Sequence, residues 1–373
     1  MKIDARIGAK IFALWLASRI WVAIWVYAGH INRPFREPVE SGYAGVTNFW
    51  LNAWTTFDSY WYLRIAKIGF EPLSAGFFPF YSLLLRLAGP GETATAAWGV
   101  ALSNLGFAVG LGFLFLLTKL DWGEKIAFRA VFLTTFFPIS AVFSAVYTEG
   151  VYFALLTGAF WFFRQKKWFS AAIFGFLVAL TRNAGPIISA ALCLEAFRLP
   201  KSERKQALLV ALMPILGFLA VQTFLYFQFQ GLGATKTQEL YGRSLGWPYL
   251  PIWRDLSNVF AGRALEITTI LNLAATLAAI YFLVRGLRSE RISSSVLLGG
   301  IMLAQLCLGR TSAPYTNSSL RFLMTTFPFA QHLARASEKL TANRLRTAIC
   351  VSAYLLACAL MSYLFGQKQF VTG

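Results

Sequence analysis

Long apolar runs recur along the whole chain and are separated by short segments rich in Lys and Arg. A helix that crosses a bilayer needs about 20 apolar residues, and about eleven segments approach this length, some of them short enough to need polar turns at membrane depth. These segments are residues 8–29, 94–118, 128–146, 149–163, 168–181, 185–198, 207–230, 264–285, 292–309, 319–334 and 347–366. The pattern predicts an all-α polytopic membrane protein.

The composition excludes several classes of soluble protein. Of the 373 residues, 57% are hydrophobic and 13% are charged, whereas about 25% of a soluble domain is charged. This excludes a disordered chain, a disulfide-rich secreted scaffold and an ordinary cytosolic enzyme. The formal net charge is +18, but the basic residues punctuate apolar runs instead of forming one face. We therefore expect membrane lipids and no nucleic acid among the partners.

The stretch Gly76–Ala88 decides the orientation of the chain. With Pro79 and Arg86 inside about a dozen residues, it resembles an interfacial or half-inserted helix more than a spanning one, and the charge of the loops decides between the two. Most Lys and Arg residues then fall in cytoplasmic loops, whereas a crossing here would reverse that balance. The sequence predicts a cytoplasmic N-terminus and an extracytoplasmic C-terminus.

No linker or fixed-period repeat divides the chain, so residues 1–373 are expected to form a single membrane domain. Within it, residues 30–93 would be a large first extracytoplasmic loop that carries interfacial helices. Residues 94–230 would form the helical core, and residues 231–373 the C-terminal helices and outer loops.

The densest group of polar and aromatic residues lies between Phe57 and Phe70. If this segment is helical, Asp58, Trp61 and Tyr62 share one face. Aromatic neighbours partly desolvate a carboxylate, which suits a general base, and aromatic rings also stack on sugars. The alternative is an interfacial helix with Asp58 as its N-cap.

Two further polar segments interrupt apolar runs on the predicted outer side. Glu149 follows Tyr147 and Thr148, and a carboxylate between apolar spans is costly and usually functional; alternatively, Thr148 caps a helix whose N-terminus favours Glu149. Arg182, with Asn183 beside it, can bind phosphate oxygens through both arms of its guanidinium or can extend to the interface.

The remaining polar candidates are more isolated. Arg321 has the same two interpretations as Arg182, and Gln238 and Arg243 lie in a polar and aromatic outer loop. His30 and His332 lack partners at metal-ligand spacing and are expected to be structural, so no metal site is predicted. No nucleotide-binding or serine-hydrolase motif is visible, which favours an activated substrate carried in the membrane.

Taken together, these motifs resemble the PIG-V family, which includes the second mannosyltransferase of GPI-anchor synthesis and bacterial relatives. Two departures are Phe57, where the family often has Trp, and Ile68, where it often has His. The resemblance rests on Asp58, Tyr60–Leu63, Ile65, Ala66, Gly69 and Phe70, then on Phe77–Pro79, and finally on Pro138, Ser144, Ala145, Tyr147, Glu149, Arg182 and Gly185.

The resemblance implies a GT-C glycosyltransferase fold and an inverting mannosyltransferase in a bacterial plasma membrane. The donor would be an undecaprenyl- or dolichyl-phosphate mannose, and the acceptor a glycan or glycolipid hydroxyl on the extracytoplasmic side. No cofactor would be required, although a Glu–Asp pair is able to hold Mg²⁺. The alternatives are a lipid-linked-sugar flippase and a non-catalytic subunit of a glycosylation complex.

The resemblance also implies roles for individual residues. Asp58 would take the proton of the acceptor hydroxyl, and Glu149 would hold a sugar hydroxyl, orient the acceptor or assist a divalent ion. Arg182, with Arg321 or Arg243, would neutralise the departing phosphate. The substrate contacts would be Trp61, Tyr62, Arg64, Tyr147, Asn183 and Gln238.

Overall fold

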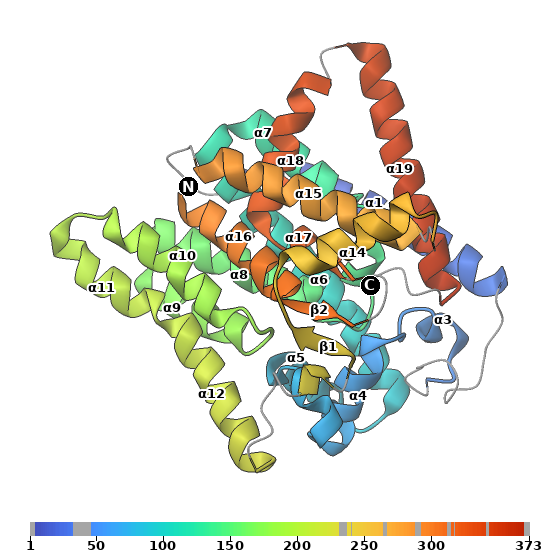
Figure 1. The fold of residues 1–373 in the computed structure, drawn as a ribbon, viewed down its shortest axis with the longest axis horizontal. Coiled ribbons are helices and arrows are strands. Elements are labelled where there is room, and N and C mark those ends of the chain that lie inside the picture. Colours follow the sequence, from blue (N-terminus) through green and yellow to red (C-terminus); the bar gives the residue numbers. More distant parts are fainter. Residues whose placement is uncertain are drawn as a thin grey trace. The chain divides into compact units, whose positions relative to one another are not determined.

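The computed structural model describes residues 4–32, 46–230, 237–239, 241–263, 267–287, 292–311, 315–316, 318–340 and 343–368. This part of the chain is almost entirely helical and includes one small two-stranded sheet (Figure 1). The predicted all-α class is therefore confirmed. The chain divides into two compact units: residues 1–69, 79–161 and 330–371 form the first, and residues 70–78, 162–329 and 372–373 form the second.

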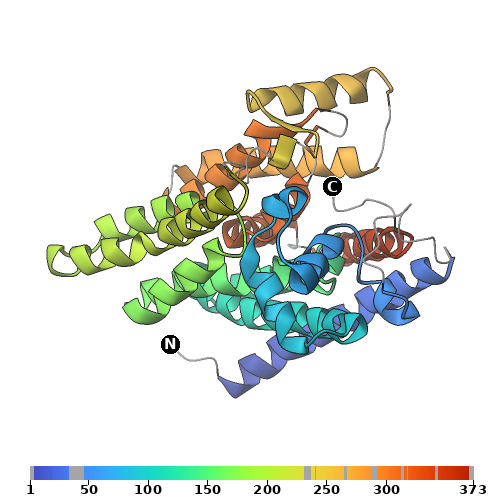
Figure 2. The same ribbon diagram turned by 90° about the horizontal axis from the view of Figure 1, so that it is seen from below.

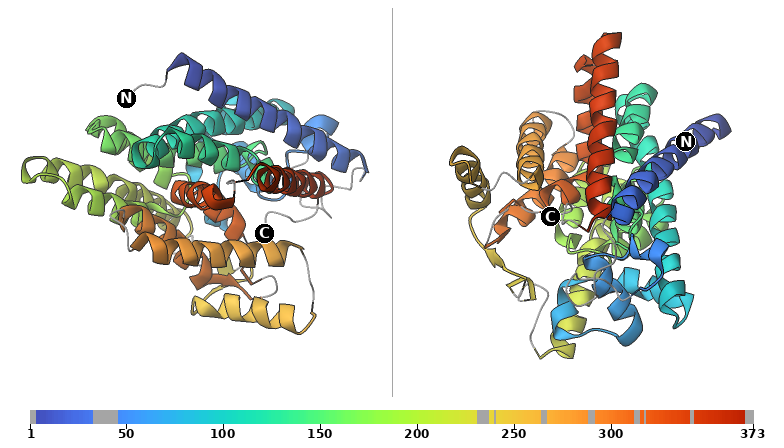
Figure 3. Two further views of the ribbon diagram at one scale, coloured as in Figure 1. Left: turned by 90° about the horizontal axis from the view of Figure 1, so that it is seen from above. Right: turned by 90° about the vertical axis from the view of Figure 1, so that its right-hand side faces the viewer.

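The first unit is organised around the pairing of its N-terminal and C-terminal helices, α1 and α19. A Cβ atom at Gly29 of α1 would lie 2.0 Å from the backbone oxygen of Tyr363, and one at Gly366 of α19 would lie 2.0 Å from that of Val26. Only glycine permits so close an approach of the two backbones, which is visible in Figure 3. The elements of this unit are α1 (Ala5–Asn32), α3 (Phe49–Asn52), α4 (Asp58–Ile68), α5 (Pro79–Leu85), η2 (Arg86–Ala88), α6 (Glu92–Trp122), α7 (Glu124–Thr135), η3 (Ser140–Phe143), most of α8 (Glu149–Arg164), most of α18 (Phe327–Leu340) and α19 (Arg344–Gly366).

In the second unit, α9 to α12 pack against one another, as Figure 2 shows. Gly217 lies against the backbone of Phe176, where a Cβ atom would be 2.5 Å from the carbonyl oxygen. β1 and β2 are antiparallel, with Arg243 opposite Arg310. The elements are η1 (Pro72–Gly76), α9 (Trp168–Ala179), α10 (Gly185–Phe197), α11 (Lys201–Ala211), α12 (Met213–Gln228), β1 (Arg243–Leu245), α14 (Tyr249–Phe260), α15 (Ile267–Leu287), α16 (Ile292–Cys307), β2 (Leu308–Arg310) and α17 (Ser319–Met324).

Five described helices are long and apolar enough to cross a membrane: α1, α6, the continuous pair α11–α12, α15 and α19. The shorter apolar helices α9, α10 and α16 coincide with three more of the predicted segments. Two predicted segments are divided: 128–146 contains the end of α7, then η3, and 319–334 is split between α17 and α18. Short helices that end at polar turns are tolerated in membrane proteins where other parts of the protein satisfy their backbone groups.

Arg19 gives the physical reason for the break after α7. Its guanidinium is buried in α1 and donates hydrogen bonds to the backbone oxygens of Thr135 and Ser140, both at 3.1 Å, and to the hydroxyl of Ser144 at 3.0 Å. The same group lies 4.7 Å from the ring centroid of Phe107. A permanent cation in an apolar helix is costly unless acceptors surround it, and the carbonyls freed where α7 ends provide them.

The stretch Gly76–Ala88 contains α5, which has seven residues, and the short turn η2. Seven helical residues extend about 10 Å, far less than the hydrocarbon thickness of about 30 Å. The structure thus agrees with the interpretation that this stretch does not cross. The orientation of the chain in the membrane stays a prediction.

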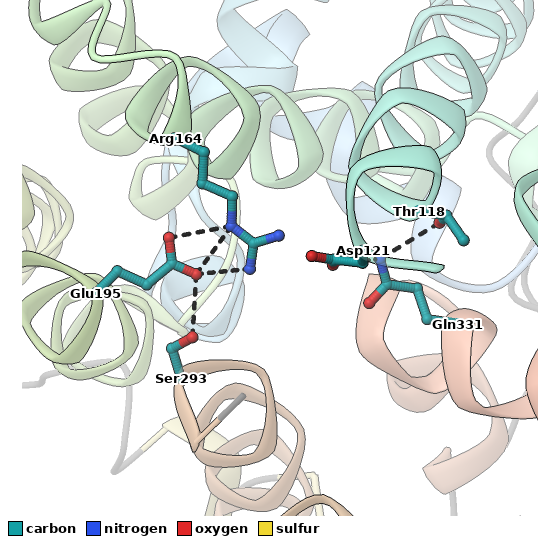
Figure 4. Close-up of polar contacts among 6 residues, drawn as sticks. All are labelled: Thr118, Asp121, Arg164, Glu195, Ser293 and Gln331. Atoms are coloured by element: carbon teal, nitrogen blue, oxygen red, sulfur yellow. Dashed lines mark hydrogen bonds and ion pairs between the residues drawn. The ribbon is translucent and has the colours of Figure 1, made fainter. Parts of the chain in front are cut away.

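Each unit has a polar cluster that connects its helices (Figure 4). In the second unit, Arg164 and Glu195 form a largely buried ion pair at 2.6 Å, and the hydroxyl of Ser293 donates to the same carboxylate at 3.0 Å. In the first unit, the Gln331 amide donates to Asp121 at 3.1 Å and to Thr118 at 3.3 Å. These groups satisfy one another, so we assign both clusters a structural role.

Candidate active site

Helix α4 carries the first predicted site residue, Asp58, in its first turn. The N-cap position is occupied by Phe57, whose φ of 50° is in the left-handed region that residues other than glycine rarely adopt. The alternative in which Asp58 is the N-cap is therefore wrong. Asp58 is half-buried at the N-terminal end of this helix.

Hydroxyl groups connect α4 to the segment before α8. The Tyr62 hydroxyl lies 3.4 Å from the Thr148 hydroxyl, and the Tyr62 ring meets the Tyr81 ring edge-on with centroids 5.3 Å apart. The Tyr81 hydroxyl lies 2.7 Å from that of Ser103, which donates to the backbone oxygen of Tyr147 at 3.0 Å. α4, α5 and α6 therefore meet at residues 147–148 through side chains that are all buried.

Glu149, the first residue of α8, is fully buried next to this group. Burial above all, and then the neighbouring Tyr62 and Glu149, raise the pKa of Tyr81 above its ordinary value. Tyr81 consequently keeps its proton and can act as a hydrogen-bond donor. Asp58 lies one helical turn before Tyr62 on the same face of α4, and both belong to the first unit with Glu149.

Glycines allow α6 and α8 to approach closely at this point. A Cβ atom at Gly150 would lie 2.0 Å from the backbone oxygen of Ser103, and one at Gly106 would lie 2.7 Å from the backbone carbon of Gly150. The sequence therefore positions Glu149 through a backbone contact that a larger residue would prevent.

We expect Gly150→Ala to lower the thermal stability of the detergent-purified protein, because overpacking a close contact costs about 1–3 kcal/mol. Gly246→Ala is the matched control, since a Cβ atom there would meet no other atom within 4 Å. Melting curves followed by tryptophan fluorescence measure the effect. Equal melting temperatures for the two variants would contradict this account of the α6–α8 contact.

The other predicted residues of α4 lie around Tyr60. The Trp61 ring is edge-on to Tyr60 with centroids 5.1 Å apart, and the Arg64 guanidinium lies 5.8 Å from the Tyr60 ring centroid. All three side chains are half-buried. They form a partly accessible aromatic and basic flank of the helix that bears Asp58.

In the second unit, two of the three predicted phosphate-binding arginines contact α17, the helix that carries the third. Arg182 lies in the turn between α9 and α10, and its guanidinium is 4.6 Å from the ring centroid of Phe322 in α17. Arg321, the residue before Phe322, is 5% exposed. Arg243 of β1 donates to the hydroxyl of Ser318 at 3.4 Å, and Ser318 is the N-cap residue of α17. Arg182 and Arg243, from distant parts of the sequence, thus contact the six-residue helix that carries Arg321.

Gln238 and Asn183 have different surroundings in this unit. Asn183 is exposed beside Arg182. Gln238 packs against η1, with its Nε2 atom 2.8 Å from the position that a Cβ of Gly76 would take. Nearby, the Tyr241 hydroxyl donates to the backbone oxygen of Leu73 at 2.5 Å, so a segment of the predicted first loop packs with Gln238 and Tyr241.

The predicted site residues therefore form two groups. Asp58, Trp61, Tyr62, Arg64, Tyr147 and Glu149 belong to the first unit, and Arg182, Asn183, Gln238, Arg243 and Arg321 belong to the second. That the two groups serve one active site stays a prediction. Across the described residues, no three His, Cys, Asp or Glu side chains are grouped as metal ligands.

The sequence interpretation missed Tyr81 and Ser103, which connect α4 to residue 147. The available signal was a polar pair, Ser103 and Asn104, inside the apolar run 94–118, because small polar residues in membrane helices usually mark helix contacts. Tyr81 gave no such signal, since aromatic residues are common throughout this chain.

No family model matches the sequence, and no curated protein matches it. Among solved structures, the chain is similar to ArnT from Cupriavidus metallidurans bound to undecaprenyl phosphate, with a TM-score of 0.52, 11% identity and coverage of 97% of this chain and 76% of that chain. The apo state of ArnT gives a TM-score of 0.51 at 13% identity, with the same coverage. The apo oligosaccharyltransferase of Archaeoglobus fulgidus gives 0.47 at 14% identity, covering 96% of this chain and 56% of that chain. The chain is an integral membrane protein with the GT-C glycosyltransferase fold.

Proposed function

We propose that this protein is a polyprenyl-phosphate-sugar-dependent glycosyltransferase of the PIG-V type. It would be an inverting mannosyltransferase that transfers mannose from a lipid-phosphate donor to a hydroxyl of an extracytoplasmic glycan or glycolipid. The observation that carries the proposal is that Arg182 and Arg243 contact α17, the helix that carries Arg321. Support for a lipid-phosphate ligand comes from ArnT, a protein of the same fold that binds undecaprenyl phosphate.

The arginines suit the phosphate of such a donor. Guanidinium groups bind phosphate oxygens in a bidentate manner and keep their charge at every physiological pH. Arg321 is nearly buried, and a cation in a poorly solvated site interacts more strongly with an anion than one in water. The three cations would stabilise the negative charge that grows on the phosphate as it leaves.

Asp58 is proposed as the general base. The acceptor oxygen forms a bond to the anomeric carbon while the bond from that carbon to the phosphate oxygen breaks. The proton of the hydroxyl passes to the Asp58 carboxylate, and the polyprenyl phosphate leaves with the electron pair of the broken bond. Attack from the face opposite the phosphate inverts the anomeric configuration.

Glu149 and its neighbours are proposed to bind the sugar or the acceptor. Glu149 is a buried carboxylate that follows Thr148 in the chain and helps to raise the pKa of Tyr81, and a carboxylate accepts hydrogen bonds from sugar hydroxyls. Trp61, at the partly accessible flank of α4, would stack on a sugar ring. Mannose as the sugar rests on the resemblance to the PIG-V family.

The direct test is transfer by the purified protein in lipid nanodiscs. We expect it to consume synthetic polyprenyl-phosphate mannose when a glycolipid acceptor is present, and native mass spectrometry to detect a co-purified polyprenyl phosphate. Polyprenyl-phosphate glucose is the control donor for sugar specificity. Donor translocation without transfer would identify a flippase, and inactivity that a partner protein relieves would identify a subunit of a complex; both results contradict the proposal.

The proposed orientation places the site outside the cytoplasm. In a background without native cysteines, we expect an impermeant maleimide added to whole cells to label Lys67→Cys and Glu239→Cys and to spare Lys166→Cys and Ser202→Cys, all at exposed positions. Permeabilised cells provide the control, because all four variants should then react. Labelling of Lys166→Cys in intact cells would show the opposite orientation.

A further inference from the structure

Helix α14 points its apolar side away from the protein. Tyr249, Trp253 and Phe260 are 60%, 66% and 86% exposed, and Leu256 between them is half-buried. Their spacing of four, three and four residues puts all four on one helical stripe. A surface helix of a water-soluble domain turns such a stripe toward its core, so α14 has the reverse arrangement.

The opposite side of α14 is fixed to the protein by Asp255, which is fully buried. Its carboxylate accepts hydrogen bonds from the backbone nitrogen of Tyr315 at 2.9 Å, and from the backbone nitrogen and hydroxyl of Thr316 at 2.7 and 2.6 Å. A rotation of the helix about its axis would leave this buried charge without its partners, which is strongly unfavourable. The outward direction of the aromatic stripe is therefore determined by the structure.

The chain connection keeps α14 near a membrane surface. α14 ends at Phe260 and α15, one of the five candidate membrane helices, begins at Ile267. Seven residues span at most about 25 Å even when fully extended. The C-terminal end of α14 therefore lies close to the point where α15 meets the headgroup region.

The residue types on and beside the stripe match a lipid headgroup region. Trp and Tyr rings concentrate at the boundary between hydrocarbon and water, and Trp247, just before the helix, is also exposed. Arg254 and Arg263 are exposed, and their guanidinium groups are complementary to lipid phosphates. Arg254 follows Trp253 by one residue, about 100° around the helix, so its charge lies beside the stripe and not within it.

We propose that α14 lies flat in the membrane interface, with Tyr249, Trp253 and Phe260 inserted at the boundary of the acyl chains. The occupant of the exposed face is thus the phospholipid surface around the end of α15. This inference does not depend on the proposed transfer reaction. The bilayer would then help to hold α14 in position. Asp255 connects this helix to Thr316, which lies just before α17 and its Arg321.

Spin labels at single cysteines test this placement. Trp253→Cys and Phe260→Cys would be labelled in a background without native cysteines and reconstituted in nanodiscs of phosphatidylethanolamine and phosphatidylglycerol. We expect both labels to be more accessible to dissolved oxygen than to a water-soluble nickel chelate. The matched control is Arg254→Cys on the side of the same helix, where the preference should reverse.

Two outcomes would overturn the proposal. Preferential access of the nickel chelate at all three positions would show that the stripe faces water. Immobile labels that neither reagent reaches would show that a protein, such as a second copy of this chain, covers the stripe. A monodisperse elution profile and an unchanged helical circular dichroism spectrum for each variant ensure that the labels report on the folded protein.

Discussion

Asp58→Asn is expected to lower the turnover of mannose transfer by about 10²–10⁴-fold, the usual contribution of a positioned general base. Asn has nearly the same shape as Asp but cannot accept the proton of the acceptor hydroxyl at neutral pH. Because Asp58 starts α4 without serving as its cap, the helix and its contact through Tyr62 should persist. The Michaelis constant for the donor should change little, and initial rates at saturating donor measure the effect.

Glu92→Gln is the matched control, since Glu92 is also a carboxylate in the first turn of its helix, α6, but is an exposed one that pairs with Lys67 at 2.5 Å. It should retain the rate of the unaltered protein. Wild-type turnover in a correctly folded Asp58→Asn variant would remove Asp58 from the mechanism. A loss of folding in Asp58→Asn alone, seen as aggregation on size-exclusion chromatography, would instead make the residue structural.

We expect substitutions of Arg182 to change the donor affinity and the transfer rate to different extents. Arg182→Lys should retain part of the donor affinity but lose about 10²–10³-fold in turnover, the loss found when one preorganised donor to a developing anion is removed. Lys provides a point charge, whereas the planar guanidinium both stacks on Phe322 and binds phosphate through two nitrogens. Arg182→Ala should lose donor binding as well. Isothermal titration with polyprenyl phosphate and the transfer rate report the two quantities separately.

The control for this pair is Arg198→Lys, because Arg198 is an exposed arginine at the C-terminal end of α10. Neither its donor affinity nor its rate should change. If the Arg182 side chain only extends toward the membrane interface, Lys should replace it fully. An unchanged donor affinity and transfer rate for Arg182→Lys would therefore show that Arg182 does not bind the phosphate. Lower melting temperatures for Arg182→Lys and Arg182→Ala with unchanged donor affinity would show that the contact with Phe322 serves stability alone.

The sequence was sufficient for properties that depend on local patterns. Apolar length and the low content of charge determine that the chain is a helical membrane protein, since a buried backbone in lipid must satisfy its hydrogen bonds within helices. The same patterns mark α4 as a helix in which Asp58 and Tyr62 share a face. Together with the charge of the loops, they also indicate that Gly76–Ala88 does not cross.

The sequence was not sufficient for contacts between distant segments. No periodicity reveals that Arg19 would end α7 early by binding the carbonyls of Thr135 and Ser140, so the sequence predicts one uninterrupted segment over 128–146. Nor did the sequence indicate that Tyr81 and Ser103 would connect α4 to the start of α8. Such contacts depend on how whole helices pack, which residue spacing within one helix does not encode.

The three predicted phosphate-binding arginines show most clearly what the sequence determined and what only the tertiary structure decided. Sequence alone established that Arg182, Arg243 and Arg321 are permanent cations in or beside apolar runs, where a charge is costly unless an anion or a set of acceptors compensates it. Only the tertiary structure decided that Arg182 and Arg243 contact the helix that carries Arg321, through Phe322 for Arg182 and Ser318 for Arg243. The physical reason is that the cost of a charge follows from its local surroundings, which the sequence shows, whereas the identity of its neighbours follows from the packing of α9, α17 and β1, which lie far apart in the chain.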